Sequence, residues 1–470
     1  MNSTLRSIDT DSLGIVSMIR ERYETIGQDV GPVGNIYMVF MHDLVVHFTG
    51  ILMHRVAREY YSDSVQFPWI DKKYALAPFL VDSIGNGYAG RHYSLYSRLR
   101  RLPLSRAALG EALPFGYQQD RMVAKLVNLL GSYKPFVQAY LPNRHDQIWD
   151  LLDCVSELCR LHGIPNSETV RHNWRRYVDI HSTQQQSVIK ERGLLLGTRN
   201  SLQNRKLAVN YLQQDKEVVA VSHGEVANSV MDEPPFGYSE RTLCTTLVDY
   251  GDFDSDGEYN VPLIPPRRLI KRDAPVVRSI HQANSEIRLS TRQFSRALYI
   301  PTTYSGNGLY GPFHIYEDAV YSRWQQALFE SLPTLTMKVH PKSRSQPPAN
   351  VSLEIRQLEN CIQDYELFVF DYFATGSMLA LMTPKPVIYF DIGLRRLHRM
   401  FEQDIKSRCE YAKIDLCGDL SNQVIGALDR FLLEEKTRNN NVIAQYALCQ
   451  ESRFNWLNLL KSVARGVSPS

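Results

Sequence analysis

The stretches that decide the fold are LTMKVHP at residues 335–341, FVFDYFATGS at 368–377 and PVIYFD at 386–391. Each holds a short apolar run next to polar residues, and prolines precede the third run. Short apolar strands that alternate with helical segments are typical of a parallel sheet with crossover helices. We therefore predict an α/β fold, with a helix carried by residues 378–382 between the last two strands.

Three small residues, Thr375, Gly376 and Ser377, fall at the start of that predicted helix. The first backbone N–H groups of a helix have no partner within the helix, and the helix dipole places positive charge at the same end. Such a place suits an anion, and a nucleotide diphosphate is the obvious candidate. The alternative is that Thr375 and Ser377 only cap the helix, and these residues alone leave both interpretations open.

A local cationic site is predicted around the end of the preceding strand, where four basic residues lie close in sequence: Lys338, His340, Lys342 and Arg344. The whole chain is nearly neutral, with 53 Lys and Arg, 50 Asp and Glu and a net charge of +3. This balance argues against a nucleic-acid partner, whereas the local cluster indicates an anionic ligand.

A second polar group follows the compact apolar run Glu217–Val221, which reads as a buried strand that leads into Ser222-His223-Gly224-Glu225. Ligands of open α/β sheets gather at the carboxyl ends of strands. A histidine can accept a proton near neutral pH, and a glycine lets the backbone approach a ligand closely. Either His223 or Glu225 is a candidate general base. The alternative is a strand-end histidine beside a surface glutamate.

Length and composition indicate a soluble protein of two domains. The 470 residues exceed what one hydrophobic core usually organises, and 44% hydrophobic with 22% charged residues is ordinary for a globular protein. The seven cysteines are scattered, which favours a reducing cytoplasm over a disulfide framework or a zinc site. Neither a signal peptide nor a run of about 20 apolar residues is evident, so we expect no membrane span.

Hydrophobic periodicity predicts further elements. They are helices at Arg144–Leu161, Glu317–Leu332, Asn422–Leu433 and Asn441–Leu460, and a strand at Ala297–Pro301. Prolines and a basic cluster between Leu263 and Ala274 predict a linker between two α/β halves. The glycine-rich stretch Ser83–Gly90 is interpreted as a turn, and the basic stretch Arg98–Arg106 as a solvated face.

Five motifs occur in an order that resembles a known family. They are His223-Gly224 after a strand, Tyr-Ile-Pro-Thr-Thr at 299–303, Lys-Val-His-Pro-Lys at 338–342, Asp-Tyr followed by Ser at 371–377, and Lys-Pro-Val-Ile-Tyr-Phe at 385–390. This order resembles the GT-B glycosyltransferases of bacterial surface-polysaccharide synthesis, which serve capsule, lipopolysaccharide and teichoic acid. It looks closest to the branch that includes the CDP-glycerol glycerophosphotransferases. The resemblance covers roughly residues 217–391.

The resemblance implies two Rossmann-like domains that face each other across a cleft, the GT-B arrangement. We expect residues 1–275 to form an acceptor-side α/β domain with helical insertions. Residues 276–425 are expected to form the domain that binds the nucleotide donor. Residues 426–470 are expected to be helices that pack back on the cleft or on the amino-terminal domain.

The resemblance also implies roles for single residues. His223 matches the histidine proposed as catalytic base, with Glu225 as the alternative, and His340 matches the histidine that contacts the donor phosphate. Ser377, together with Thr375 and Gly376, matches the start of the phosphate-binding helix. Other expected phosphate contacts are Lys338, Lys342 and Arg344, and the expected contacts to the nucleotide or sugar are Thr302, Tyr304 and Asp391.

Two departures from the family pattern bear on the donor. Thr303-Tyr304 stands where the glycerophosphotransferases usually have Trp-Arg, and Asp371-Tyr-Phe-Ala-Thr375 stands where they have Asp-Tyr-Ser-Ser. These changes favour a nucleotide sugar over a CDP-glycerol donor.

The expected activity is transfer of a sugar from a nucleotide-activated donor to a hydroxyl group of a growing bacterial surface polysaccharide or lipid-linked glycan. We expect no cofactor and no metal, because no clear Asp-x-Asp pair stands beside an apolar strand and the acidic run at 252–256 is interpreted as solvated. The alternatives are a CDP-glycerol-type polyol-phosphate transferase and an epimerase-like or other sugar-nucleotide-binding protein. We expect a cytoplasmic protein that can associate peripherally with the inner face of the membrane.

Overall fold

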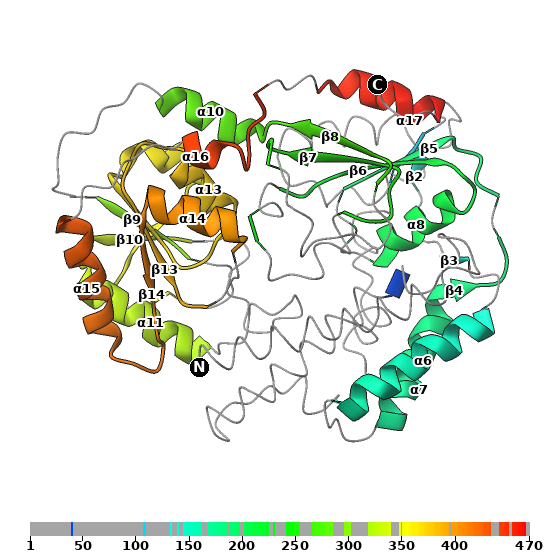
Figure 1. Ribbon diagram of the computed structural model, residues 1–470, viewed down its shortest axis with the longest axis horizontal. Helices are drawn as coiled ribbons and strands as arrows, with labels where there is room; N and C mark the ends of the chain where they lie inside the picture. Colours follow the sequence, from blue (N-terminus) through cyan, green and yellow to red (C-terminus); the bar gives the residue numbers. More distant parts are fainter. Residues whose placement is uncertain are drawn as a thin grey trace.

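The computed structural model describes part of the chain. The described residues are 39–40, 107–109, 132–133, 139–140, 144–161, 167–186, 188–197, 199, 202–224, 229–230, 241–253, 266–284, 296–301, 318–339, 347–348, 350–393, 397–433, 441–450 and 454–466. They form two six-stranded sheets, in each of which neighbouring strands are parallel, with helices against the sheets (Figure 1). The predicted α/β class is therefore confirmed. The stretches at 83–90 and 98–106 lie outside the described residues.

The first sheet has the strand order β2-β1-β5-β6-β7-β8. Its strands are β1 (Ala107–Leu109), β2 (Ser132–Tyr133), β5 (Gly193–Leu196), β6 (Glu217–Val221), β7 (Thr246–Tyr250) and β8 (Arg268–Arg272). The central strands β5, β6 and β7 are buried along their whole length. Continuous burial is typical of parallel strands covered on both faces, and β6 coincides with the strand predicted from its apolar run.

Three long helices belong to this half of the chain: α6 (Arg144–Leu161), α7 (Ser167–His181) and α8 (Leu202–Leu212), of which α8 contacts β5 and β6. The bounds of α6 agree with its hydrophobic periodicity, and α6 packs against α7. A short parallel pair, β3 (Ala139–Tyr140) and β4 (Ser182–Thr183), lies beside α8. The amide of Tyr140 donates to Asn210 Oδ1 at 2.9 Å, which fixes β3 against this helix.

The second sheet has the strand order β11-β10-β9-β12-β13-β14. Its strands are β9 (Ala297–Ile300), β10 (Leu335–Lys338), β11 (Ser352–Glu354), β12 (Leu367–Phe370), β13 (Val387–Asp391) and β14 (Glu410–Lys413). Numbered along the chain within this sheet, the order is 3-2-1-4-5-6, which is the order of Rossmann-type nucleotide-binding sheets. The order reverses between β9 and β12, so the carboxyl ends of these two strands flank the topological switch point.

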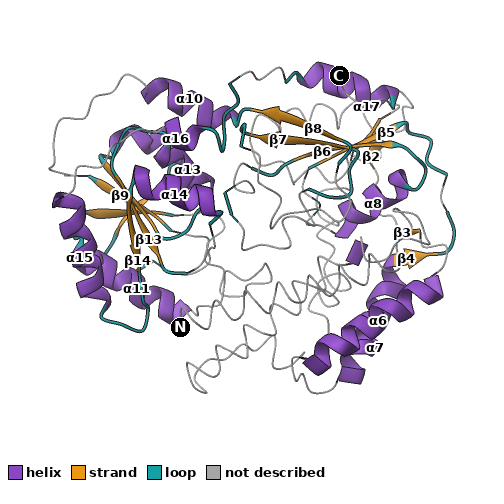
Figure 2. Ribbon diagram, in the orientation of Figure 1, coloured by secondary structure: helices purple, strands orange, loops and turns teal. Residues whose placement is uncertain are grey.

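Helices cover both faces of the second sheet (Figure 2). They are α10 (Pro275–Asn284), α11 (Asp318–Ser331), α12 (Leu358–Cys361), the 3₁₀ turn η4 (Ile362–Asp364), α13 (Thr375–Leu381), α14 (Arg399–Arg408), α15 (Leu420–Leu433) and α16 (Asn441–Ala444). Leu298 and Ile300 of β9 face the core that contains α13 and α14, whereas Tyr299 between them faces the core of α11 and α15. Side chains alternate between the faces of a strand, so one short apolar run contributes to both cores.

The predicted linker at Leu263–Ala274 is wrong, because Arg268–Arg272 is β8, the edge strand of the first sheet. Arg272 is buried, and its guanidinium lies 4.3 Å from the centroid of the Phe454 ring. Arg268 is exposed at the edge. Charged side chains are common on edge strands. The basic residues of β8 therefore led to the incorrect prediction of a linker.

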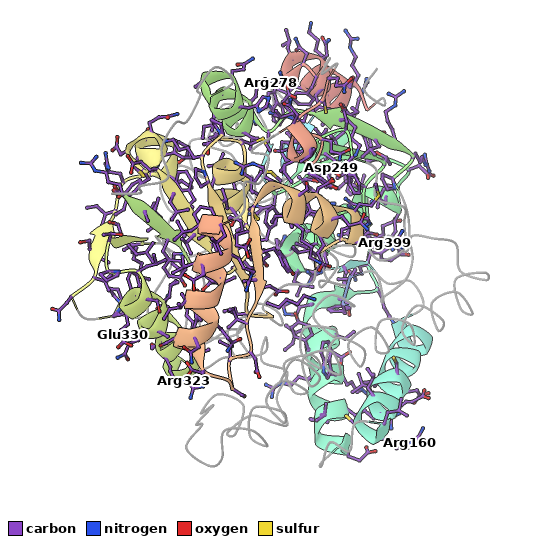
Figure 3. The ribbon with its side chains drawn as sticks, turned by 60° about the vertical axis from the view of Figure 1, so that its left-hand side comes forward. Arg160, Asp249, Arg278, Arg323, Glu330 and Arg399 are labelled. Atoms are coloured by element: carbon purple, nitrogen blue, oxygen red, sulfur yellow. The ribbon has the colours of Figure 1, made fainter. Side chains whose placement is uncertain are left out.

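The predicted terminal helix Asn441–Leu460 is instead two helices, α16 (Asn441–Ala444) and α17 (Trp456–Arg465). The residues after α16 form a turn whose carbonyl oxygens accept tertiary hydrogen bonds. In one of these, Arg278 of α10, which is labelled in Figure 3, donates to the carbonyl oxygen of Cys449 at 2.7 Å. Hydrophobic periodicity reflects only which residues share a helix face. It therefore could not indicate that the helix ends at Ala444.

The last helix, α17, returns to the first sheet, where Leu459 and Val463 pack against the strands (Figure 1). A Cβ atom added to Gly193 of β5 would lie 2.4 Å from the carbonyl oxygen of Val463. Glycine at this position therefore permits the close approach of helix and strand. The domain limits expected at residues 275 and 425 stay predictions. Within the described ranges, none of the helices combines the length and apolar character that crossing a membrane requires.

Candidate functional site

Two segments that the sequence predicts separately as candidate sites lie side by side in the structure: the end of β6 and the start of α13. His223 and Gly224 follow β6 of the first sheet, and α13 of the second sheet begins at Thr375. A Cβ atom added to Gly224 would lie 3.5 Å from Thr375 Oγ1, which is ordinary van der Waals contact. His223 is exposed beside this contact. The segment that carries the candidate base therefore lies beside the start of the candidate phosphate-binding segment.

The position of α13 is the switch point of the second sheet. The helix follows β12, and a Cβ atom added to Gly376 would lie 3.2 Å from Ile300 Cγ2 at the end of β9. The start of α13 thus lies against the carboxyl ends of the two strands between which the strand order reverses. Ligands of open α/β sheets bind at such a point. Gly376 leaves room for this close packing.

The hydroxyl of Ser377 is used within the loop before α13. Ser377 is fully buried, its Oγ donates to the carbonyl oxygen of Tyr372 at 2.8 Å, and the amide of Ala374 donates to the same Oγ at 3.4 Å. These contacts are those of a helix cap, the alternative considered for this residue. A role of Ser377 in phosphate binding stays a prediction. Thr375 is the residue of the trio whose side chain lies against Gly224.

A buried carboxylate, Asp371, begins this loop directly after β12 and is 1% exposed. It accepts hydrogen bonds from Tyr299, from Tyr321 at 2.8 Å and from the indole Nε1 of Trp324 at 2.8 Å. Burial raises the pKa of Asp371 to about 6, while the hydrogen bonds from these donors act in the opposite direction. Burial and the neighbouring carboxylate also raise the pKa of both tyrosines well above the usual range, so they remain neutral donors.

Sequence reasoning did not single out the Asp371 cluster as part of the site. Tyr321 and Trp324 are separated by one helical turn on α11, and an aspartate at the end of a buried strand needs partners. These two signals together could have indicated a buried polar cluster. Its third donor, Tyr299, lies on β9 and becomes a neighbour only through the pairing of β9 with β12.

Two further expected donor contacts are engaged in local structure. Lys338, the last residue of β10, is 9% exposed, and its Nζ donates to the carbonyl oxygen of Val339 at 2.8 Å. Burial lowers its pKa, against the opposing effect of nearby acidic groups. Asp391, at the end of β13, accepts from the Tyr411 hydroxyl at 2.6 Å and from the amide of Gly393 at 3.0 Å. Contact of either side chain with a donor stays a prediction.

The remaining candidate residues lie outside the described residues: Glu225, Thr302, Tyr304, His340, Lys342 and Arg344. The segment after Gly224 resumes at Ser229, whose carbonyl oxygen accepts from the amide of His398 at 2.9 Å. Val230 and Leu397 form an antiparallel bridge beside it. The strand end of the first sheet is therefore held against the second half of the chain at more than one place.

Two hydroxyl groups near this contact have no hydrogen-bond partner. Ser222 and Ser229 are 1% and 0% exposed, and the Oγ atom of each is buried and unpaired. A buried hydroxyl without a partner is unfavourable by about 1–3 kcal/mol. Among the described residues, no group of three or more His, Cys, Asp or Glu side chains is arranged to hold a metal ion.

Comparisons with known proteins find similarity at the level of three-dimensional structure. No protein-family model matches the chain, and no curated protein matches its sequence. The chain is similar to the glycotransferase of kitacinnamycin, with 9% identity, 77% of this chain and 99% of that chain covered, and a TM-score of 0.37. A glycosyltransferase from Rickettsia africae ESF-5 shows 9% identity, coverage of 73% and 94%, and a TM-score of 0.34. The spinosyn rhamnosyltransferase SpnG, complexed with spinosyn aglycone, shows 12% identity, coverage of 77% and 97%, and a TM-score of 0.34.

Proposed function

We propose that the protein is a glycosyltransferase that moves a sugar from a nucleotide-activated donor to a hydroxyl group of an acceptor. The observation that supports this most is the contact of Gly224 with Thr375, which brings His223 to the switch point of a sheet with Rossmann strand order. A transferase needs a base for the acceptor beside a site for the donor. A strand end of one sheet against the nucleotide-binding edge of another can supply both.

In the proposed reaction, His223 accepts the proton of the acceptor hydroxyl, or Glu225 accepts it if the histidine only orients the acceptor. The acceptor oxygen forms a bond to the anomeric carbon of the sugar. The bond between that carbon and the phosphate oxygen breaks, and its electron pair leaves with the nucleoside diphosphate. His223 exposes an imidazole at the strand end, as this step requires.

The leaving group gains negative charge as the bond breaks, so donors that are already oriented toward it lower the barrier. We assign this role to Thr375, to the backbone around Gly376 and Ser377, and to the basic residues that follow β10. The latter are His340, Lys342 and Arg344, with Lys338 at the strand end. Contacts of Thr302, Tyr304 and Asp391 with the nucleotide or sugar complete the proposed donor site.

The proposed acceptor is a hydroxyl of a bacterial surface polysaccharide or of a lipid-linked glycan, on the strength of the motif order described above. A CDP-polyol donor would change the products, because attack at phosphorus releases a nucleoside monophosphate instead of a diphosphate. The proposed reaction also needs no divalent ion. Turnover that persists after exhaustive dialysis against EDTA is the expected result, and loss that added Mg²⁺ or Mn²⁺ restores would contradict it.

A thermal-shift screen with UDP, CDP, CMP, GDP and their sugar or glycerol conjugates tests the proposal. A ligand that binds the folded state raises the melting temperature, by an amount that grows with its concentration. We expect one nucleoside diphosphate and its conjugates to stabilise the protein. No shift with any of them would contradict the transferase. Stabilisation only by CMP and CDP-glycerol would identify the polyol-phosphate reaction, and binding without release of nucleotide from acceptor mixtures would identify a binding protein.

A further inference from the structure

We propose that Asp371 is a positioning residue for the donor site, acting through the loop Tyr372–Ala374 on Thr375. The proposal rests on the proposed function, because it concerns the same site. The residue that lies against Gly224 is Thr375. Asp371 anchors the start of the loop between β12 and α13 that leads to Thr375.

The anchor joins three elements around the switch point. Tyr299 comes from β9, Tyr321 and Trp324 come from successive turns of α11, and all three donate to the carboxylate of Asp371. Tyr321 also approaches the second carboxylate oxygen at 3.1 Å. The two strands that flank the switch point are thus connected through one side chain, and the helix that follows β9 is tied to the same point.

The loop is fixed at its other end as well. Ser377 accepts from the amide of Ala374 and donates to the carbonyl oxygen of Tyr372. Phe373 inside the loop is fully buried, with its ring 4.5 Å from that of Phe401. Thr375 follows immediately and lies against Gly224. Asp371, Phe373 and Ser377 therefore each make contacts that fix the backbone before or after Thr375.

Burial of a carboxylate among aromatic side chains is expensive, and apolar residues of similar volume would often stabilise a core equally well. Unlike an apolar side chain, a carboxylate accepts hydrogen bonds, and these form only when the donors lie in particular directions. The donors on β9 and α11 can all reach Asp371 only when the loop after β12 has the observed arrangement. Directional fixing of a segment is useful where a ligand must be held in one geometry.

The test compares two substitutions that remove the same chemical group. Tyr321→Phe deletes a hydroxyl that donates to Asp371 at 2.8 Å, and Tyr446→Phe deletes a hydroxyl that donates to Asp404 at 2.7 Å. Both tyrosines are buried. Tyr446 lies in the segment after α16, and its ring, which packs on Phe401 at 4.7 Å, is kept in Tyr446→Phe. Only its hydroxyl group is lost, and that group donates to Asp404 and not to the Asp371 cluster. Asp371→Asn serves as a second variant, because it keeps the side-chain shape but replaces one acceptor oxygen by a donor.

Binding of UDP, CDP and GDP is measured by calorimetry for the wild type and each variant, together with amide hydrogen exchange of the peptide that spans 372–379. We expect Tyr321→Phe to weaken binding of the nucleotide that the wild type prefers by about tenfold and to speed exchange in this peptide. Tyr446→Phe should change both by less than about twofold, although its loss of stability is similar. With the matching donor sugar, the donor KM should rise in Tyr321→Phe while kcat at saturation and the acceptor KM change little.

Equal nucleotide affinity in the wild type, Tyr321→Phe and Asp371→Asn would overturn the positioning role and leave the transferase proposal intact. Equal weakening by Tyr321→Phe and Tyr446→Phe would also overturn it, because the effect would then follow general stability. If the wild type binds none of the three nucleotides, both proposals fail. If Tyr321→Phe does not fold, Tyr299→Phe takes its place with the same expected outcomes.

Discussion

The ends of β6 and β12 occupy equivalent places, each at the carboxyl edge of a parallel sheet, but they use polar residues in opposite ways. His223 after β6 is exposed, whereas Asp371 after β12 is buried and accepts hydrogen bonds from aromatic donors. The side chain after β6 lies at the surface, whereas the side chain after β12 forms internal hydrogen bonds. The comparison shows that a polar residue at a strand end is not by itself a reactive group.

The difference has a physical origin in what surrounds each strand end. Asp371 faces the core that contains α11, where Tyr321 and Trp324 supply donors. A charged group in such a core requires partners, and these fix its position. His223 is exposed after β6, so its imidazole is accessible at the surface. Burial among donors therefore distinguishes the end of β12 from the end of β6.

The largest effect is expected from His223→Ala. If His223 is the base of the proposed reaction, its loss should lower kcat by about a hundredfold or more, because a positioned base contributes about that factor. Nucleotide affinity should remain close to the wild-type value. The exposed His172 of α7 provides the control, since His172→Ala removes the same side chain from the same half of the chain. Equal turnover in both variants would assign the base to Glu225 or to another group.

Asp371→Asn is expected to have the largest effect on stability. The amide retains one acceptor oxygen, so at least one buried donor loses its partner, and the free energy of unfolding should fall by about 3 kcal/mol in urea titrations. Asp215→Asn is the control in the first half of the chain, because Asp215 is exposed at a turn with a positive φ of 51° that asparagine also accepts. A loss below about 1 kcal/mol for Asp371→Asn would mean that the cluster rearranges around the amide.

Alanine substitutions at three glycines compare how tightly each position is packed: Gly193 in β5, Gly224 after β6 and Gly376 in α13. Gly193→Ala should destabilise by about 2 kcal/mol, because its methyl group would lie 2.4 Å from the Val463 carbonyl oxygen and α17 would have to move. Gly376→Ala should have an intermediate effect, as the nearest atom is at 3.2 Å. Gly224→Ala should change stability by less than about 0.5 kcal/mol, because its nearest neighbour is at 3.5 Å. Thermal or urea unfolding of the three variants checks this order, and a large loss from Gly224→Ala would show a tighter contact with Thr375.

Stability should also depend on pH through two carboxyl groups of the second half of the chain. Burial raises the pKa of Asp371 from 3.8 to about 6, so the stability linked to this group is present below about pH 3.8 and is lost as the pH rises through about 6. Hydrogen bonds from Arg356 lower the pKa of Glu354 from 4.5 to about 2, so its contribution is present above about pH 4.5 and is lost as the pH falls toward 2.

Unfolding free energies measured across this pH range should separate the two groups. Asp371→Asn should remove the loss that occurs on raising the pH toward 6, and Glu354→Gln should remove the loss that occurs on lowering the pH toward 2. A wild-type curve whose slope between these values is unchanged by either substitution would contradict both assignments. Arg356 is half exposed, so the effect of Glu354 should shrink in high salt.

Much of the fold could be predicted because its signals are local. The strand Glu217–Val221 and the helix Arg144–Leu161 agree with the structure in their bounds, since each is a continuous apolar run or a helical stripe with clear ends. Prediction failed at Arg268–Arg272, where an edge strand is rich in basic residues. It failed again after Ala444, where tertiary hydrogen bonds interrupt the helix. In both places distant residues decide the local structure.

In the candidate site, too, the sequence predicts the positions of residues along the chain but not their contacts. The sequence predicts His223, Gly224 and Thr375 as candidate residues from their positions near the ends of apolar runs. Their contact was expected only through the family resemblance, and the structure supplies the distance. Ser377 was named as well, yet its hydroxyl caps α13. Whether a hydroxyl faces a ligand or its own loop depends on the turn geometry, which residue type does not specify.

By itself the sequence determined which segments become strands and helices and which polar residues stand at their ends, because apolar periodicity and prolines act over a few neighbouring residues. Only the tertiary structure decided that the second sheet has the order 3-2-1-4-5-6, that Gly224 meets Thr375, and that Asp371 is enclosed by donors from β9 and α11. Sheet order and side-chain enclosure arise from packing between segments far apart in the chain. Such contacts depend on the shapes of whole elements, and no local pattern records them.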